Sequence, residues 1–142
     1  MSDDTSELQN IRFDIAHVRP SYDLDESDDP AGFEETLSVM IRGETKPSIK
    51  GASAFGLIHI KASRQMEATD IERVYSDASE GVGLVSSTTD GLIVLTALPF
   101  DAAWRIADAI HTGQIGKALV ECDPIEGLGA SSAVRSLRFM PA

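Results

Sequence analysis

Residues 82–98, VGLVSSTTDGLIVLTAL, carry a strong local structure signal. Two apolar runs, VGLVSS and LIVLTAL, flank the segment Thr88-Thr89-Asp90-Gly91. Asp-Gly between two apolar runs is typical of a β-hairpin, because both residue types tolerate the positive φ angles of a tight turn. The second run is apolar on both faces of a strand. It therefore predicts a strand that other elements cover on each side.

A short helix is predicted directly after this hairpin. Pro99 ends the second strand, and Asp101 is a good N-cap residue. One helical stripe then holds the apolar residues Ala102, Ala103, Ile106, Ala107 and Ile110. Gly113 is the expected left-handed cap at the other end. A helix of roughly ten residues is marginal alone, so it must dock its stripe on the sheet. Trp104 lies off the stripe's centre, which predicts a place at the helix flank or in an interface.

Further strands are predicted on both sides of the hairpin and helix. From Ile11 onward, apolar and polar residues alternate strictly, which is typical of a half-buried strand. A second strand is expected at about 34–43. A third, at about 54–62, is apolar on both faces and is therefore expected to be central. Residues 115–122 and 132–140 are expected to form an antiparallel pair joined by a longer, turn-rich loop.

Residues 63–80 fit two structures. Ile71, Val74 and Tyr75 have helical spacing, yet the run IERVYS also alternates as a strand. We expect a strand, because strands lie on both sides and the apolar face of the helix would be narrow. Strands therefore dominate the chain. The expected fold is mainly β (α+β): an antiparallel β-sandwich or partly open barrel of about seven or eight strands, with one helix packed on it.

The 142 residues are enough for one domain, and their charge is concentrated at the amino end. Residues 1–36 hold eleven acids and two bases, within a formal net charge of −11 for the chain. We expect residues 1–9 to be a disordered acidic tail. Residues 10–142 are expected to form a single β-rich domain with an acidic loop at 20–32, PSYDLDESDDPAG, which is either an exposed loop or an excursion at a sheet edge.

The composition argues against several classes of partner and site. The basic residues are scattered through an acidic chain, so neither nucleic acid nor a membrane is an expected partner. The amino terminus has no basic start or apolar stretch, so a cytoplasmic location is expected. Cys122 is the single cysteine and is expected to be a small core residue. Neither a cofactor nor a metal is expected, because the three histidines lie on separate elements without ligand spacing.

One segment resembles a known family. Residues 77–84, DASEGVGL, are similar to the D-x-S-x-x-G turn of PilZ domains, although Val82 stands at the motif's glycine position and Gly83 follows it. PilZ domains are small β-barrels that bind a cyclic dinucleotide through this turn and an upstream arginine pair. The resemblance covers about eight residues. The R-x-x-x-R arginine pair of the family is missing here, and Arg64 and Arg73 are single arginines. The resemblance implies a ligand site built from the residues Arg64, Arg73, Asp77 and Ser79.

Three functions follow as expectations from these patterns. The first is a non-catalytic cytosolic protein-interaction module that self-associates, chaperone- or adaptor-like, because one helix cannot cover all the apolar sheet surface. Its partner would be another protein or a second copy of itself, as a homo-oligomer. In its expected architecture it is similar to small acidic chaperones of the SecB type, which combine an antiparallel sheet with helices and assemble as tetramers. The alternatives are a small-ligand, nucleotide-type sensor with the PilZ-like turn at 77–83, and a small hydrolase-type enzyme with a His/carboxylate site.

Overall fold

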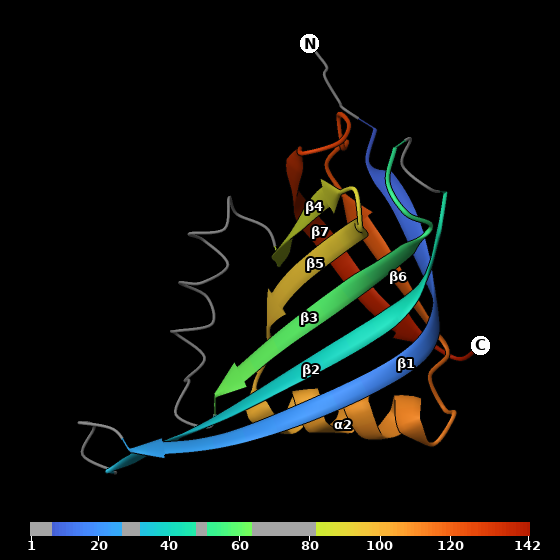
Figure 1. Ribbon diagram of the computed structural model, residues 1–142. Helices are drawn as coiled ribbons and strands as arrows, with labels where there is room; N and C mark the ends of the chain where they lie inside the picture. The colour runs from blue at the N-terminus through green and yellow to red at the C-terminus, as the bar shows by residue number, and fades with distance from the viewer. Residues whose placement is uncertain (1–6, 27–31, 48–50, 64–81) are drawn as a thin grey trace.

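The computed structural model describes residues 7–26, 32–47, 51–63 and 82–142. In this part of the chain there are seven strands and one helix, which lies below the strands in Figure 1. The elements in chain order are β1 (Gln9–Glu26), β2 (Phe33–Lys46), β3 (Phe55–Ser63), β4 (Gly83–Thr88), β5 (Gly91–Ala97), α2 (Phe100–His111), β6 (Lys117–Cys122) and β7 (Ser131–Met140). This confirms a mainly β fold with one helix packed on the sheet. Residues 64–80, where a further strand was predicted, lie outside the described residues.

The seven strands form one sheet that closes on itself. Their order is β1-β2-β3-β5-β4-β7-β6, and β6 pairs back with β1. Every neighbouring pair is antiparallel except β3 and β5, which are parallel, so the prediction of a purely antiparallel sheet was wrong at that pair. β5, which is apolar on both faces, lies between β3 and β4 and runs in the same direction as β3.

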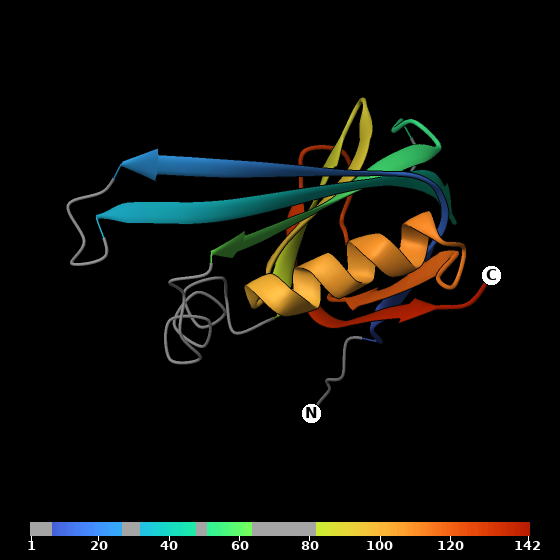
Figure 2. The same cartoon turned by 90° about the horizontal axis from the view of Figure 1, so that it is seen from below.

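The core lies inside this closed sheet, and alternate residues of each strand point into it. The largest side chains with less than 2% exposure are Phe13, Ile11, Leu37, Ile41, Ile58, Ile60, Leu92, Val39, Val85, Val94, Val120 and Val134. α2 covers one opening of the ring. Seen from below, it lies between the β1–β3 strands and the β6–β7 strands (Figure 2). Its buried residues are Phe100, Ala103, Ala107 and Ile110, so the predicted apolar stripe is confirmed in its centre.

The hairpin is confirmed, but the start of the helix differs from the prediction. β4 and β5 pair from Thr88 and Gly91 outward, as the sequence predicts. The helix begins at Phe100 with Pro99 as its N-cap, and the N–H of Ala103 donates to the carbonyl oxygen of Pro99 at 3.0 Å. The prediction of Asp101 as N-cap was therefore wrong. Asp101 lies in the first helical turn, where its negative charge meets the positive end of the helix dipole.

β1 pairs with β6 only along its first part. This pairing runs from Gln9 to Asp14, after which the N–H of Ile15 donates to the carbonyl oxygen of Gly116 at 3.0 Å. A one-residue bulge at Ala16 then shifts the register of β1 against β2. β2 pairs with β3 without any shift, and its odd-numbered residues bond to β3, as the N–H of Thr45 does to the carbonyl oxygen of Ala54. The even-numbered residues of β2 therefore bond to β1, and beyond the bulge their partners are the odd-numbered residues of β1. The even-numbered residues of β1 direct their backbone N–H and C=O groups away from β2, toward an open edge.

This geometry explains why the predicted acidic loop at 20–32 is partly a strand. Residues 20–26 belong to β1 and pair with β2, from Pro20 opposite Val39 to Glu26 opposite Phe33. Proline has no N–H to donate, but at an even position the missing donor faces the open edge. The ladder to β2 therefore stays intact, and the loop prediction was wrong for 20–26. Residues 27–31 lie outside the described residues.

Candidate functional site

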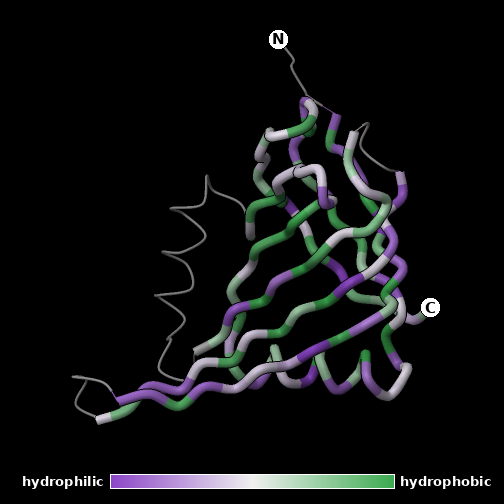
Figure 3. Tube along the Cα trace, viewed as in Figure 1, coloured by the Kyte–Doolittle hydropathy of each residue, from purple (hydrophilic) through white to green (hydrophobic). Residues whose placement is uncertain are grey.

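The outer parts of β1 and β2 form an arm, defined here as residues 20–26 and 33–39. Figure 2 shows these paired strands extending past the end of α2 and away from the ring. Along the arm, hydrophilic segments are interrupted by short hydrophobic ones (Figure 3). Tyr22, Leu24 and Phe33 are 46%, 60% and 42% exposed. They share one face with the fully buried Leu37 and Val39, so the core-facing side of the sheet continues into solvent here.

Tyr22 fixes the arm to the beginning of α2. Its hydroxyl donates to Oε2 of Glu35 at 2.8 Å, and its ring meets the ring of Phe100 edge-on at 6.2 Å between centroids. Phe100 in turn contacts Trp104, with centroids 6.4 Å apart. Trp104 remains 40% exposed at the flank of the helix. The inner face of the arm is therefore an ordered surface, held by aromatic contacts.

The second feature of the arm is the open edge of β1. In the described part of the chain, no strand pairs with this side of β1 beyond Asp14. The bulge turns the backbone groups of Val18 and Leu24 toward this edge. Unpaired strand edges are templates for another strand. The arm thus combines the open backbone groups of Val18 and Leu24 with exposed apolar side chains.

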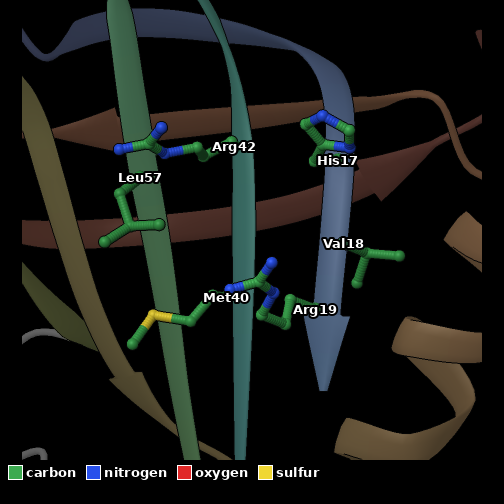
Figure 4. Close-up of a pocket in the computed structure, with 6 residues that line it drawn as sticks. All are labelled: His17, Val18, Arg19, Met40, Arg42 and Leu57. Atoms are coloured by element: carbon green, nitrogen blue, oxygen red, sulfur yellow. The ribbon is translucent and has the colours of Figure 1, made fainter. Parts of the chain in front are cut away.

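The outer face of the sheet carries a basic hollow beside the arm. It has a volume of about 660 Å³ and is lined by His17, Val18, Arg19, Met40, Arg42 and Leu57. Figure 4 shows the Arg19 side chain reaching across β2 beside Met40, and the Arg42 side chain reaching across β3 beside Leu57. Within the described residues, the side chains of His17, Arg19 and Arg42 make no hydrogen bond or ion pair.

The acids near this hollow lie at its two ends. On one side, Asp14 accepts from Arg12 and lies 3.7 Å from Lys46, whose Nζ also lies 3.3 Å from Glu44. On the other side, Asp23 and Asp25 stand on β1 at positions that share the outer face with His17 and Arg19. The outer face of β1 therefore changes from basic to acidic toward the tip of the arm.

The histidines do not form a catalytic cluster in the described part of the chain. The strand partner of His17 is Arg42, and those of His59 are Met40 and Leu95, none of them a carboxylate. Burial, and then the charge of Lys61, lower the pKa of His59, whose Nε2 is buried without a hydrogen-bond partner. His111 lies in the last turn of α2. Among the described residues, no group of three or more His, Cys, Asp or Glu could hold a metal ion.

The site residues implied by the PilZ resemblance lie outside the described residues. These are Arg64, Arg73, Asp77 and Ser79. The basic hollow was not predicted, because Arg19 and Arg42 are distant in sequence and their meeting depends on the register between β1 and β2. The alternation of each strand does carry a usable signal. It places Arg19 on the face of His17, and Arg42 on the face of Met40.

Comparisons of the chain with family models, with curated proteins and with solved structures find no match. Among the described residues, no helix has the length and apolar character needed to cross a membrane. What supports a function for this chain is therefore its own surface chemistry, above all that of the arm.

Proposed function

We propose that this protein is a non-catalytic, cytoplasmic interaction module that self-associates and acts as a chaperone or adaptor. The observation that carries the proposal is the open edge of β1 beyond Asp14, flanked by the exposed side chains of Tyr22 and Leu24. A strand added to this edge would satisfy backbone groups and bury apolar area in one step. Burial of apolar surface stabilises by roughly 25 cal/mol per Å².

The cysteine and two of the histidines of the chain support a non-catalytic function. Cys122 is buried with a raised pKa, so its thiol is a poor nucleophile. His17 and His59 have no carboxylate among their strand partners to orient an imidazole for general base catalysis. The exposed chemistry of the described residues lies instead along a strand edge and an apolar face, as in proteins that bind other chains.

Sedimentation velocity over a concentration series tests this proposal. We expect the chain to sediment as a species larger than its 15.2 kDa monomer at high concentration, and to dissociate on dilution. Leu24→Ser removes an apolar side chain that is already 60% exposed, so folding should persist while the dissociation constant rises about tenfold. Leu128→Ser is the matched control, because Leu128 is 49% exposed and lies in the loop between β6 and β7, outside the arm. A wild-type chain that stays monomeric throughout contradicts the proposal.

A second candidate function, the binding of a small anionic ligand, is favoured by the basic hollow. Two arginines and a histidine without ion pairs face a volume in the range of ligand pockets, and Met40 and Leu57 provide apolar contact. Arginine forks bind phosphate groups through paired hydrogen bonds. A nucleotide-type sensor is therefore the alternative function, and its ligand would bind in the basic hollow and not at the PilZ-like turn.

Thermal-shift measurements with AMP and with inorganic phosphate separate this second function from the first. Binding should raise the melting temperature, since a ligand that binds only the folded state stabilises it. Arg42→Gln should abolish the shift. Arg105→Gln, on the exposed face of α2, should leave it unchanged. An unchanged melting temperature at millimolar concentrations of both compounds would exclude the anion-binding function.

A further inference from the structure

The arm has the chemistry to pair with its own copy in one register. We propose that two copies join by antiparallel pairing of β1 with the partner's β1, centred on Ser21, an inference that rests on the proposed self-association and names its partner and geometry. The two sheets then become one continuous sheet across a twofold axis. The contact is isologous, so it closes as a dimer and does not propagate.

Backbone geometry restricts the possible registers. Only even-numbered residues of β1 beyond the bulge present N–H and C=O groups to the edge, so even residues must oppose even residues. Centring on Ser21 places Val18 opposite the partner's Leu24, and Pro20 opposite the partner's Tyr22. Each exposed apolar side chain of β1 on the inner face thus gains an apolar neighbour across the axis. Pro20 has no N–H, so one backbone hydrogen bond is missing on each strand. The neighbouring pair, Val18 with the partner's Leu24, has both of its backbone hydrogen bonds.

Charge distinguishes this register from its neighbours. Centring on Ser21 places Arg19 opposite the partner's Asp23, and His17 opposite the partner's Asp25, all on the outer face. Centring on Pro20 leaves only the contact of His17 with the partner's Asp23. Centring on Tyr22 leaves only the contact of Arg19 with the partner's Asp25. Centring on Arg19 or Asp23 puts like charges together on the axis, which is unfavourable. The change from basic to acidic along β1 is therefore self-complementary about one residue, and that residue is Ser21.

This pairing also gives a role to the uneven charge of the chain. His17 and Arg19 make no ion pair within the described residues, and the arm tip carries acids in a chain of net charge −11. An antiparallel pair brings the basic root of each arm to the acidic tip of the other. Complementary charge then sets the register, while the backbone bonds and the inner apolar face hold the two copies together.

Reversal of single charges tests the register directly. Arg19→Asp alone opposes two acids in a homodimer, and Asp23→Arg alone opposes two bases, so each variant should dimerise at least tenfold more weakly. In an equimolar mixture every Asp–Arg contact is restored, so native mass spectrometry should find the heterodimer in preference to either homodimer. Arg105→Asp and Asp108→Arg change the charge equally on the exposed face of α2 and should leave dimerisation unchanged.

A cysteine at the axis gives an independent measurement. Ser21 would face the partner's Ser21 in a pair without mutual hydrogen bonds, with Cα atoms about 4.5 Å apart. That spacing is within the range of a disulfide. Ser21→Cys should therefore form a covalent dimer under mild oxidation. Ser38→Cys should not, although Ser38 is the strand partner of Ser21 on β2. The native Cys122 is buried and does not interfere.

The outcomes separate this inference from the function on which it rests. If the wild-type chain self-associates but the mixed variants form no heterodimer and Ser21→Cys does not cross-link, the register is wrong and self-association stands. If the wild-type chain is monomeric at all concentrations, both proposals are wrong. Recovery of the heterodimer together with cross-linking at Ser21 alone establishes the register.

Discussion

Cys122 is the residue whose chemistry the fold changes most. Its side chain is fully buried at the end of β6, and burial, with a smaller contribution from the Asp123 carboxylate, raises the pKa of the thiol from 9.0 to about 11. Asp123 is held in its charged form, because hydrogen bonds from Arg135 lower the pKa of its carboxyl group. The folded state therefore prefers the neutral thiol. Its contribution to stability is complete below pH 9 and is lost as the pH rises toward 11.

Alkylation of Cys122 should consequently report unfolding. At pH 8.5 we expect iodoacetamide to modify the folded chain at least 100-fold more slowly than the chain in urea, because the thiolate is the reactive form and the sulfur is buried. Mass spectrometry of quenched samples measures both rates. Between pH 9 and 11, the free energy of unfolding should fall less for Cys122→Val than for the wild type. Equal labelling rates with and without urea would contradict the buried position.

Two turns show what short stretches of sequence determine at the scale of an element. Gly91 follows the predicted hairpin turn with φ of +124°, and Gly113 follows α2 with φ of +82°. Both were predicted from local residue types, because a left-handed backbone selects glycine whatever surrounds it. The start of α2 was predicted less well, since Pro99 and Asp101 are both suited to a helix start. The bulge at Ala16 has no residue signature, so the length of β1 and the basic hollow that depends on it could not be predicted.

These two glycines should differ in the cost of an added methyl group. A Cβ at Gly113 would have no atom within 4 Å. Gly113→Ala should therefore reduce the free energy of unfolding by about 1 kcal/mol, the cost of a left-handed backbone at a residue with a Cβ. A Cβ at Gly91 would overlap the carbonyl oxygen of Phe55 on β3. Gly91→Ala should therefore reduce the free energy of unfolding by about 3 kcal/mol or more, by strain in the hairpin and its contact with β3.

Urea denaturation of both variants beside the wild type measures this difference. The slope with denaturant should stay the same in all three, so the midpoints compare directly. Gly113→Ala is the control for the backbone term alone. Equal losses for the two variants would mean that β3 and the hairpin turn are not in close contact.

At the scale of the whole molecule, the sequence predicts the class of fold but not how the sheet closes. Alternation predicts which residues of a strand share a face, since a period of two is a local property. The parallel pairing of β3 with β5 and the return of β6 to β1 join segments distant in sequence. Those pairings depend on which edges remain free once the hairpins form, which no single segment records. The proposed dimer extends the same principle, because the edge left free in one copy is satisfied only by another.

A closed sheet with one core should unfold in a single cooperative step. Trp104 is the only tryptophan, so its fluorescence reports α2, while far-UV circular dichroism mainly reports the strands. The helix has 12 residues and is marginal alone, so it should lose its structure together with the core that buries Phe100 and Ala107. The two urea transitions should coincide. Phe13 is fully buried on β1, so Phe13→Ala should reduce the free energy of unfolding by about 3–5 kcal/mol. The urea midpoints of both transitions should therefore fall by the same amount. A fluorescence transition that precedes the loss of circular dichroism, or that ignores Phe13→Ala, would show that α2 and the sheet are separate cooperative units.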